Sequence, residues 1–287
     1  MDKFLESMGL VTGTVKDLEE VNSECFLKDT CDRCLIPNRK EVVKVIKDLQ
    51  SLLFPDYFKH SEGSENVLSQ TELMLNIYNR LAQQIKGACE FNHTVMDKTP
   101  EELCNAFISE LPRVKRMLVK DIEAIYEGDP AAKCHQEVLI CYTGFYAISI
   151  YRLANVLYNL NVPLIPRIMT EFAHEKTGID IHAGATIGEY FCIDHGTGIV
   201  IGETTTIGSR VKIYQGVTLG AKSFKVDENG NPVKNIKRHP DIGNNVVIYA
   251  NATILGGDTK IGDNCVIGGN TWLTHSVESG KVIYYDK

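Results

Sequence analysis

Residues 181–219 read IHAGATIGEYFCIDHGTGIVIGETTTIGSRVKIYQGVTL, and large hydrophobic residues recur in this stretch at intervals of six. The positions are Ile181, Ile187, Ile193 and Ile199, followed by Ile201, Ile207, Ile213 and Leu219. A period of six matches neither a helix nor a strand, whose side-chain periods are about 3.6 and about 2 residues. It is typical of a solenoid whose coils have flat sides of about six residues, each pointing one apolar side chain inward. The stretch therefore predicts a parallel β-helix.

The same period resumes after a polar interruption. It is kept by Ile242, Ile248 and Ile254 and, after a slip of one residue, by Ile261, Ile267 and Leu273. Residues 221–241, between the two series, carry the turn signals Asn229-Gly230 and Asn231-Pro232. Because each coil of a solenoid packs only on its neighbours, a loop can be extruded without disturbing the coils. We expect a β-helix domain over residues 179–275 that extrudes a loop at 221–241, followed by a short tail over 276–287.

The residues before Gly178 show helical periodicity instead. Hydrophobic side chains recur on one helical face at Val42, Ile46, Leu49 and Leu53. Thr99, followed by Pro100 and Glu102, predicts a helix start with a capping box. We expect further helices from Pro112 to Gly128, over residues 131–160 and over residues 163–176. The sequence thus predicts an α+β protein with an all-α domain over residues 1–178 ahead of the β-helix.

Bulk properties narrow the function classes. The net charge of −7 argues against a general nucleic-acid binder, and no apolar run reaches membrane-spanning length. The first ten residues lack the basic and apolar segments of a secretory signal. Nine scattered cysteines indicate reduced thiols in a cytoplasmic protein. Cys31-x-x-Cys34, with Cys25 nearby, lacks a second ligand pair at suitable spacing, so we predict no metal site there.

Polar residues that interrupt the repeat are the candidates for chemistry. Asp180 opens the first coil, His195 stands where two extra residues shift the register, and Arg238 and His239 close the extruded loop. With about 18 residues per coil, Asp180 and His195 lie on adjacent coils within hydrogen-bonding reach. A carboxylate bonded to one imidazole nitrogen would leave the other nitrogen as a general base. On spacing alone, the two side chains could equally be surface residues that never meet.

Five motifs, taken together, point to one family. They are Asp129-Pro130-Ala131, Asp180-Ile181-His182, the run from Asp194-His195 to Glu203-Thr204, the run from Gln215 to Gly220, and Arg238-His239-Pro240. In this order they resemble serine O-acetyltransferase, a hexapeptide-repeat enzyme that makes O-acetylserine from L-serine and acetyl-CoA for cysteine biosynthesis. The resemblance covers about residues 128–273 and is plausible back to about residue 70. It implies a left-handed β-helix and an acyltransferase with acetyl-CoA as co-substrate and no tightly bound cofactor.

The resemblance also implies catalytic roles. His195 would take the proton of the serine hydroxyl, and Asp180 would orient His195. The hydroxyl oxygen would then attack the thioester directly, without an acyl-enzyme, which agrees with the absence of an obvious nucleophilic Cys or Ser in these motifs. Cys192 lies close in sequence but occupies a variable coil position. His182 matches the motif, and structural support is its expected role.

The implied serine site has two charged ends. Asp129 and Asp194 would hold the α-ammonium, although helix capping could explain Asp129 and turn formation could explain Asp194. Arg238 would clamp the carboxylate, because a guanidinium fork matches a carboxylate with two parallel hydrogen bonds. His239 would lie beside the reacting side chain.

The implied coenzyme site lies in the groove between two neighbouring coils. The resemblance places it at Gly220, Ala221 and the region around Ala250. The family usually has two glycines where this chain has Gly220-Ala221, so close backbone approach to the thioester is less assured here. Four loop lysines could meet the coenzyme phosphates or form a merely solvated loop: Lys222, Lys225, Lys234 and Lys237.

Partners follow from the same resemblance. We expect a homotrimer, with His195 and the Arg238-His239 pair from different chains, and possible pairing of trimers into a hexamer. L-Cysteine differs from serine by one atom and is expected to inhibit at the serine site. The family's C-terminal isoleucine, which enters O-acetylserine sulfhydrylase, has no counterpart here because the short tail ends at Lys287, which argues against a stable complex.

Three other functions fit parts of the pattern. A different hexapeptide acyltransferase would share the β-helix, but a carboxylate clamp at Arg238 favours an amino-acid acceptor. A metal hydratase on the same β-helix would need three convergent histidines, for which His182, His195 and His239 are available. A non-catalytic assembly protein would use the solenoid surface alone.

Overall fold

The computed structural model describes residues 2–24, 36–58, 69–92, 97–223, 226–233 and 236–284. Cys25, Cys31, Cys34, Lys225, Lys234 and residues 285–287 lie outside these ranges, and with them the predictions made for the cysteine pair and the end of the tail. The described N-terminal part is helical. Its helices are α1 (Asp2–Glu24), α2 (Arg39–Leu53), α3 (Gln70–Phe91), α4 (Pro100–Gly128), α5 (His135–Cys141), α6 (Thr143–Asn159) and α7 (Ile165–Thr177).

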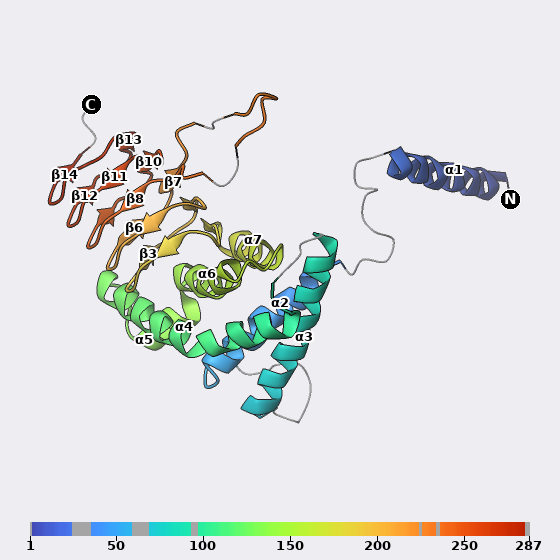
Figure 1. Ribbon diagram of the computed structural model, residues 1–287, viewed down its shortest axis with the longest axis horizontal. Helices are drawn as coiled ribbons and strands as arrows, with labels where there is room; N and C mark the ends of the chain where they lie inside the picture. The colour runs from blue at the N-terminus through green and yellow to red at the C-terminus, as the bar shows by residue number, and fades with distance from the viewer. Residues whose placement is uncertain are drawn as a thin grey trace.

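From Asp180 onward the chain winds into a left-handed parallel β-helix with three flat sides, as the sequence predicts (Figure 1). Sheet A holds β1 (Asp180–Ile181), β4 (Val200–Ile201), β7 (Thr218–Gly220), β10 (Thr253–Leu255) and β13 (Trp272–Leu273). Sheet B holds β2 (Thr186–Ile187), β5 (Thr206–Ile207), β8 (Asp241–Ile242) and β11 (Lys260–Ile261). Sheet C holds β3 (Cys192–Asp194), β6 (Lys212–Tyr214), β9 (Val247–Ile248), β12 (Val266–Ile267) and β14 (Val282–Ile283).

The six-residue repeat forms the core of the β-helix. Ile181 pairs with Ile201, and Ile201 pairs with Leu219, so one inward-facing residue per coil builds a buried column along sheet A. The first of these two steps is two residues longer than the second, because the turn that follows β3 contains the extra residues. The slip before Ile261 is absorbed in the same way, and Ile261 pairs with Ile242 in sheet B. The predicted β-helix is therefore confirmed.

Two predicted helix boundaries are wrong. Pro112 does not begin a helix but lies inside α4, which runs unbroken from the capping box at Thr99 to Gly128. Proline removes one backbone donor from a helix, which normally ends or kinks it. Here Leu111 and Val114 on either side are both buried, and this packing keeps the two halves of α4 in one helix.

The single helix expected over residues 131–160 is also interrupted. Tyr142 has an extended backbone conformation and separates α5 from α6, and α5 begins only at His135. Long-range contacts favour the interruption. The Tyr142 hydroxyl donates to Asp129, and Gly144 packs so closely on β3 that a Cβ there would lie 2.6 Å from the Ile193 carbonyl oxygen. Sequence periodicity carries no signal for such contacts.

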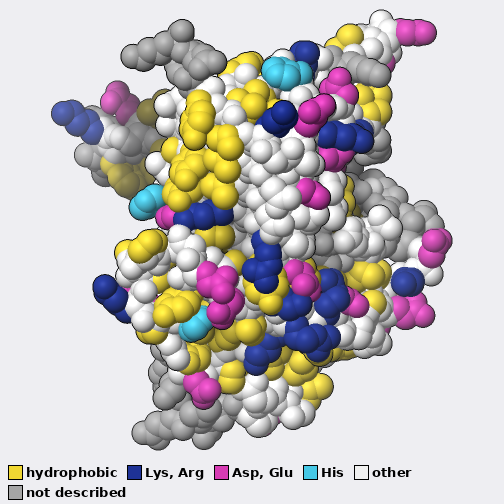
Figure 2. Space-filling model, turned by 90° about the vertical axis from the view of Figure 1, so that its left-hand side faces the viewer, with side chains coloured by type: hydrophobic (Ala, Val, Ile, Leu, Met, Phe, Trp, Pro, Cys, Tyr) yellow, Lys and Arg dark blue, Asp and Glu magenta, His cyan; other side chains and the backbone are white. Residues whose placement is uncertain are grey.

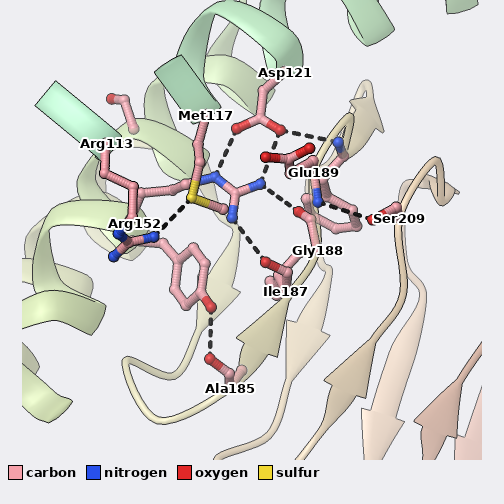
Figure 3. Close-up of polar contacts among 12 residues, drawn as sticks. Arg113, Met117, Asp121, Arg152, Ala185, Ile187, Gly188, Glu189 and Ser209 are labelled. Carbon is pink, nitrogen blue, oxygen red and sulfur yellow. Dashed lines mark hydrogen bonds and ion pairs between the residues drawn. The ribbon is translucent and has the colours of Figure 1, made fainter. Parts of the chain in front are cut away.

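The helices pack on the first coils of the β-helix. α4 and α6 both contact β3, and α7 leads directly into β1 (Figure 1). The junction is held by a buried ion pair between Arg152 of α6 and Asp121 of α4 (Figure 3). α1 stands apart in Figure 1, and its described side chains are exposed. The helices end at Thr177 and the strands begin at Asp180, while the division into two domains at Gly178 stays a prediction.

Candidate active site

His195 lies at the corner where the chain passes from sheet C to sheet A, in the turn of residues 195–199. The extra residues of this turn need left-handed backbone conformations, with φ of 59° at His195, 100° at Gly196 and 83° at Gly198. Glycine adopts such angles without a steric cost, and a non-glycine residue there is uncommon. The insertion thereby directs the imidazole outward, where 75% of the side chain is exposed.

Two carboxylates come together beside His195, one from each part of the chain. Asp194 ends β3, and its Oδ1 lies 3.7 Å from Nε2 of His195. Asp129 follows the last residue of α4, where Oδ1 accepts from the backbone N–H of Ala131 at 2.8 Å and Oδ2 accepts from the Tyr142 hydroxyl at 2.6 Å. The Tyr142 hydrogen bond is the main cause that lowers the pKa of Asp129, which therefore stays ionised.

The capping explanation for Asp129 needs correction. The sequence predicts that Asp129 opens a helix at residue 131, but Asp129 is the C-terminal cap of α4, and α5 begins only at His135. Its carboxylate therefore caps no helix N-terminus. It is held by one backbone N–H and by the hydroxyl of Tyr142, beside Asp194 and His195.

Asp180 lies near the same corner, but this single chain does not pair it with His195. Its Oδ1 lies 3.8 Å from Nη1 of Arg167, on α7. The backbone segments that carry Asp180 and His195 are hydrogen-bonded to each other, since the Gly198 N–H donates to the Gly178 carbonyl. The Asp180–His195 hydrogen bond stays a prediction.

Arg238 and His239 lie at a different corner, where the chain passes from sheet A to sheet B. Nη2 of Arg238 donates to Glu203 at 2.5 Å, and the other oxygen of Glu203 accepts from the Tyr158 hydroxyl at 2.9 Å. Burial acts to raise the pKa of Glu203, but the hydrogen bonds from Arg238 and Tyr158 outweigh it and keep the carboxylate ionised. Arg238 is thus oriented by a fixed anion.

His239 is buried against the preceding coil, at Gly202 and Thr204. Nδ1 accepts from the backbone N–H of Thr204 at 3.0 Å, and a Cβ at Gly202 would lie 2.1 Å from the imidazole, so only glycine fits there. Burial is the main cause that lowers the pKa of His239 to about 4. The imidazole is therefore neutral near pH 7 and suits hydrogen bonding rather than charge pairing.

His182, His195 and His239 do not converge on one point in this chain. His182 and His239 lie near each other, but His195 is at the other corner of sheet A. Among the described residues one group could offer three metal ligands, Glu171, His174 and Asp180, and there the Arg167 guanidinium already pairs with both carboxylates. Burial is the main cause that lowers the pKa of His182, whose Nδ1 accepts from the Gly184 N–H, so structural support remains its expected role.

The predicted coenzyme residues lie along two neighbouring coils. Gly220 ends β7 and pairs with Leu255 of β10, Ala221 follows it into the extruded loop, and Ala250 precedes β10 in the adjoining turn. Gly220 and Ala250 therefore lie toward opposite ends of the same pair of coils. In the loop, Nζ of Lys237 already donates hydrogen bonds to the Asp241 carboxylate and to the Thr204 carbonyl.

Sequence reasoning missed four residues that hold the predicted ones. Tyr142 binds Asp129, Lys212 binds Asp194, and Glu203 with Tyr158 orients Arg238. Glu203 lies inside one of the motifs quoted above, so an ion pair between its carboxylate and Arg238 could have been predicted from the sequence. Tyr158 lies in a helix, Lys212 in a strand and Tyr142 between two helices, and none of the three positions carries such a signal.

Comparisons with known proteins identify relatives of this chain. A family model described as "Serine acetyltransferase, N-terminal" matches residues 58–149. A serine acetyltransferase of Synechococcus elongatus, described as "plasmid", is 47% identical over 260 residues, which is 86% of this chain and 81% of the relative. One from Staphylococcus aureus strain N315 is 45% identical over 170 residues, covering 59% of this chain and 75% of the relative.

Solved structures give the same result. Serine acetyltransferase 1 of Entamoeba histolytica, in complex with L-cysteine, superposes with a TM-score of 0.74 at 34% identity, covering 84% of this chain and 86% of that one. A Neisseria gonorrhoeae serine acetyltransferase in complex with serine has a TM-score of 0.57 at 27% identity, covering 83% of this chain and 78% of that one.

Proposed function

Because this chain belongs to the serine acetyltransferase family and is a serine O-acetyltransferase, we propose that His195 is its general base and acetyl-CoA its acetyl donor. His195 takes the proton of the L-serine hydroxyl as the oxygen bonds to the thioester carbonyl carbon. The carbon–sulfur bond then breaks, and the CoA sulfur leaves with a proton as free thiol. The observation that carries this proposal is the outward imidazole at the C-to-A corner, beside Asp194 and Asp129.

Asp129 and Asp194 bind the α-ammonium of serine, and Arg238 binds its carboxylate. Two carboxylates near the general base suit a cation that must be held next to the reacting hydroxyl. Arg238 is charged and fixed by Glu203, so its remaining N–H groups can meet a carboxylate. Asp180 supports His195 once the complete site has formed, and neutral His239 lies beside the serine side chain.

The two ends of this serine site lie on opposite edges of sheet A, which supports a site shared between chains. His195 occupies the C-to-A corner and Arg238 the A-to-B corner. Three large hydrophobic residues of the β-helix are exposed, Val200, Tyr249 and Trp272. Figure 2 shows hydrophobic side chains gathered on the upper left of one face of the molecule, above clustered charged side chains. We propose a homotrimer in which His195 of one protomer meets Arg238 and His239 of its neighbour. Pairing of trimers into a hexamer is a further proposal.

Mixing two impaired variants, assayed at a serine concentration near the wild-type KM, tests the shared site. If each site uses two chains, His195→Ala trimers and Arg238→Gln trimers, dissociated and reassembled together, will regain part of the wild-type activity, because some interfaces combine two intact halves. CoA release after mixing and sedimentation velocity are the measurements. A sedimenting monomer, or mixtures no more active than the separate variants, would contradict the shared site.

Removing the carboxylate clamp tests the acceptor. In a thiol-release assay with acetyl-CoA we expect L-serine-dependent release of CoA. Arg238→Gln should raise the KM for serine by about 10- to 100-fold, the loss expected for a charge-assisted hydrogen-bonded pair. The KM for acetyl-CoA should change little. Release with a sugar amine but not with serine would instead favour another hexapeptide acyltransferase.

L-Cysteine is proposed to inhibit by competing for the serine site, since it shares the ammonium and carboxylate of serine and a relative binds it.

The coenzyme is proposed to bind in the groove between two neighbouring coils, at Gly220, Ala221 and Ala250. None of the described helices has the length and apolar character that a membrane span needs. A cytoplasmic location is a further proposal, supported by the scattered cysteines.

A further inference from the structure

Lys212 places a fixed positive charge next to the carboxylate pair. It begins β6 on sheet C, where its strand neighbour is Cys192 of β3. Its Nζ donates to Oδ2 of Asp194 at 2.8 Å and to the backbone carbonyl of Gly128 at 2.6 Å, and it lies 4.5 Å from the ring centre of Tyr214. The side chain is largely buried, with 17% of it exposed.

These contacts hold the ammonium in its charged form. Burial acts to lower the pKa of Lys212, but the hydrogen bonds to Asp194 and Tyr214 outweigh it and raise the pKa above its ordinary value. The Gly128 carbonyl is one of the last carbonyls of α4, which lack helical partners and carry the negative end of the helix dipole. A cation is therefore favoured at this end of the helix.

The two acceptors of Lys212 belong to the two halves of the carboxylate pair. Asp194 ends a strand of the β-helix, whereas Gly128 immediately precedes Asp129 at the end of α4. One ammonium thus ties the backbone that carries Asp129 to the side chain of Asp194. Because Oδ2 of Asp194 is taken, Oδ1 is left on the side of His195, 3.7 Å from its Nε2.

We propose that Lys212 is a positioning residue that sets the geometry with which Asp129 and Asp194 receive the α-ammonium of the substrate. This inference rests on the proposed assignment of those two carboxylates to the serine ammonium. Lys212 holds Asp194 in one orientation and supplies the second positive charge, so that two carboxylates face two ammonium groups when serine is bound. It thereby favours acceptors and inhibitors that carry an α-ammonium.

The matched variants are Lys212→Met, Lys212→Arg and Lys260→Met. Methionine keeps most of the length of the side chain and removes the charge, arginine keeps the charge and the donors, and Lys260 is an exposed lysine that begins β11 on another sheet. With Lys212→Met, the KM for serine and the inhibition constant of L-cysteine should both rise about tenfold, the effect of losing one charge-assisted hydrogen bond. The KM for acetyl-CoA should change less than twofold, and Lys260→Met should resemble the wild type.

An inhibitor without the ammonium separates positioning from general damage. Inhibition by 3-mercaptopropionate, which lacks the α-amino group of cysteine, should be equal in the wild type and Lys212→Met. Lys212→Arg should restore most of the serine affinity. Equal weakening of both inhibitors would overturn the proposal, and so would tighter serine binding in Lys212→Met, because the lysine would then only compete with the substrate. If Lys212→Met does not fold, Lys212→Gln is measured against the same outcomes.

Asp194→Asn distinguishes failure of this inference from failure of the proposed site. A raised serine KM in Asp194→Asn with an unchanged one in Lys212→Met would reject the role of Lys212 and keep the ammonium site. An unchanged serine KM in both variants would reject the ammonium site itself, and with it this inference.

Discussion

Replacement of His195 by alanine is expected to lower kcat for serine acetylation by at least ~100-fold, the usual effect of removing a general base. Without the imidazole, the serine hydroxyl must lose its proton to water while its oxygen attacks the thioester. The KM for acetyl-CoA should stay close to the wild-type value, because His195 lies in the turn before β4, whereas the coenzyme is proposed to bind between the coils of β7 and β10. CoA release at saturating serine is the measurement.

The control for this variant is His275→Ala, which removes another exposed histidine of the β-helix and should leave kcat unchanged. Equal melting temperatures of the two variants would show that the loss is chemical. Serine-dependent release of CoA that survives in His195→Ala would retain the established reaction but assign the proton transfer to another group.

In one chain the His195 imidazole is exposed, and the proposed site is completed only by a neighbouring chain. Wild-type activity is therefore expected to fall when the protein is diluted below the concentration at which the chains assemble.

The β-helix could be predicted from sequence because its core is one-dimensional. Each inward residue, such as Ile201, meets the equivalent residue of the next coil, here Leu219, so the period along the chain reproduces the contacts in space. The corner insertions could be located for the same reason. A residue that breaks the period, such as His195, must leave the regular surface and is visible as a change of register.

The helix boundaries and the contacts around the site could not be predicted in this way, because they depend on residues that lie far apart in the sequence. The interruption at Tyr142 depends on Asp129 and on the close approach of Gly144 to β3, and both contacts join segments that lie apart along the chain. The continuity of α4 through Pro112 depends on burial that local propensity does not report. The motif residues proposed for catalysis could be named from a family resemblance, but the partners that hold them, such as Lys212, appear only when two elements pack.

The second large effect is expected at the junction of the helices with the β-helix. Nε and Nη2 of Arg152 donate to the two oxygens of Asp121 at 2.7 and 2.8 Å, and the guanidinium also donates to the carbonyls of Ile187 and Gly188 (Figure 3). Only 3% of the Arg152 side chain and none of the Asp121 side chain is exposed. Arg152→Ala leaves Asp121 buried without its countercharge, so the free energy of unfolding should fall by about 3–5 kcal/mol.

Urea denaturation measures this loss, with Arg116→Ala as the control, since Arg116 is an exposed arginine of α4 and should change stability by less than about 0.5 kcal/mol. The double variant Asp121→Leu/Arg152→Met removes both charges and should cost less than the sum of the two single changes. A loss below about 1 kcal/mol in Arg152→Ala would show that the pair does not hold the junction.

The position of this pair links its stability to the proposed serine site. Oδ1 of Asp121 also accepts from the backbone N–H of Phe191 at 2.9 Å, just before β3, the strand that ends at Asp194. Asp121 is itself part of α4, the helix that ends beside Asp129. The buried pair therefore sets the helix and the strand in register, and the two carboxylates stand at their adjacent ends. At urea concentrations where Arg152→Ala is still folded, its serine KM should accordingly rise more than its acetyl-CoA KM.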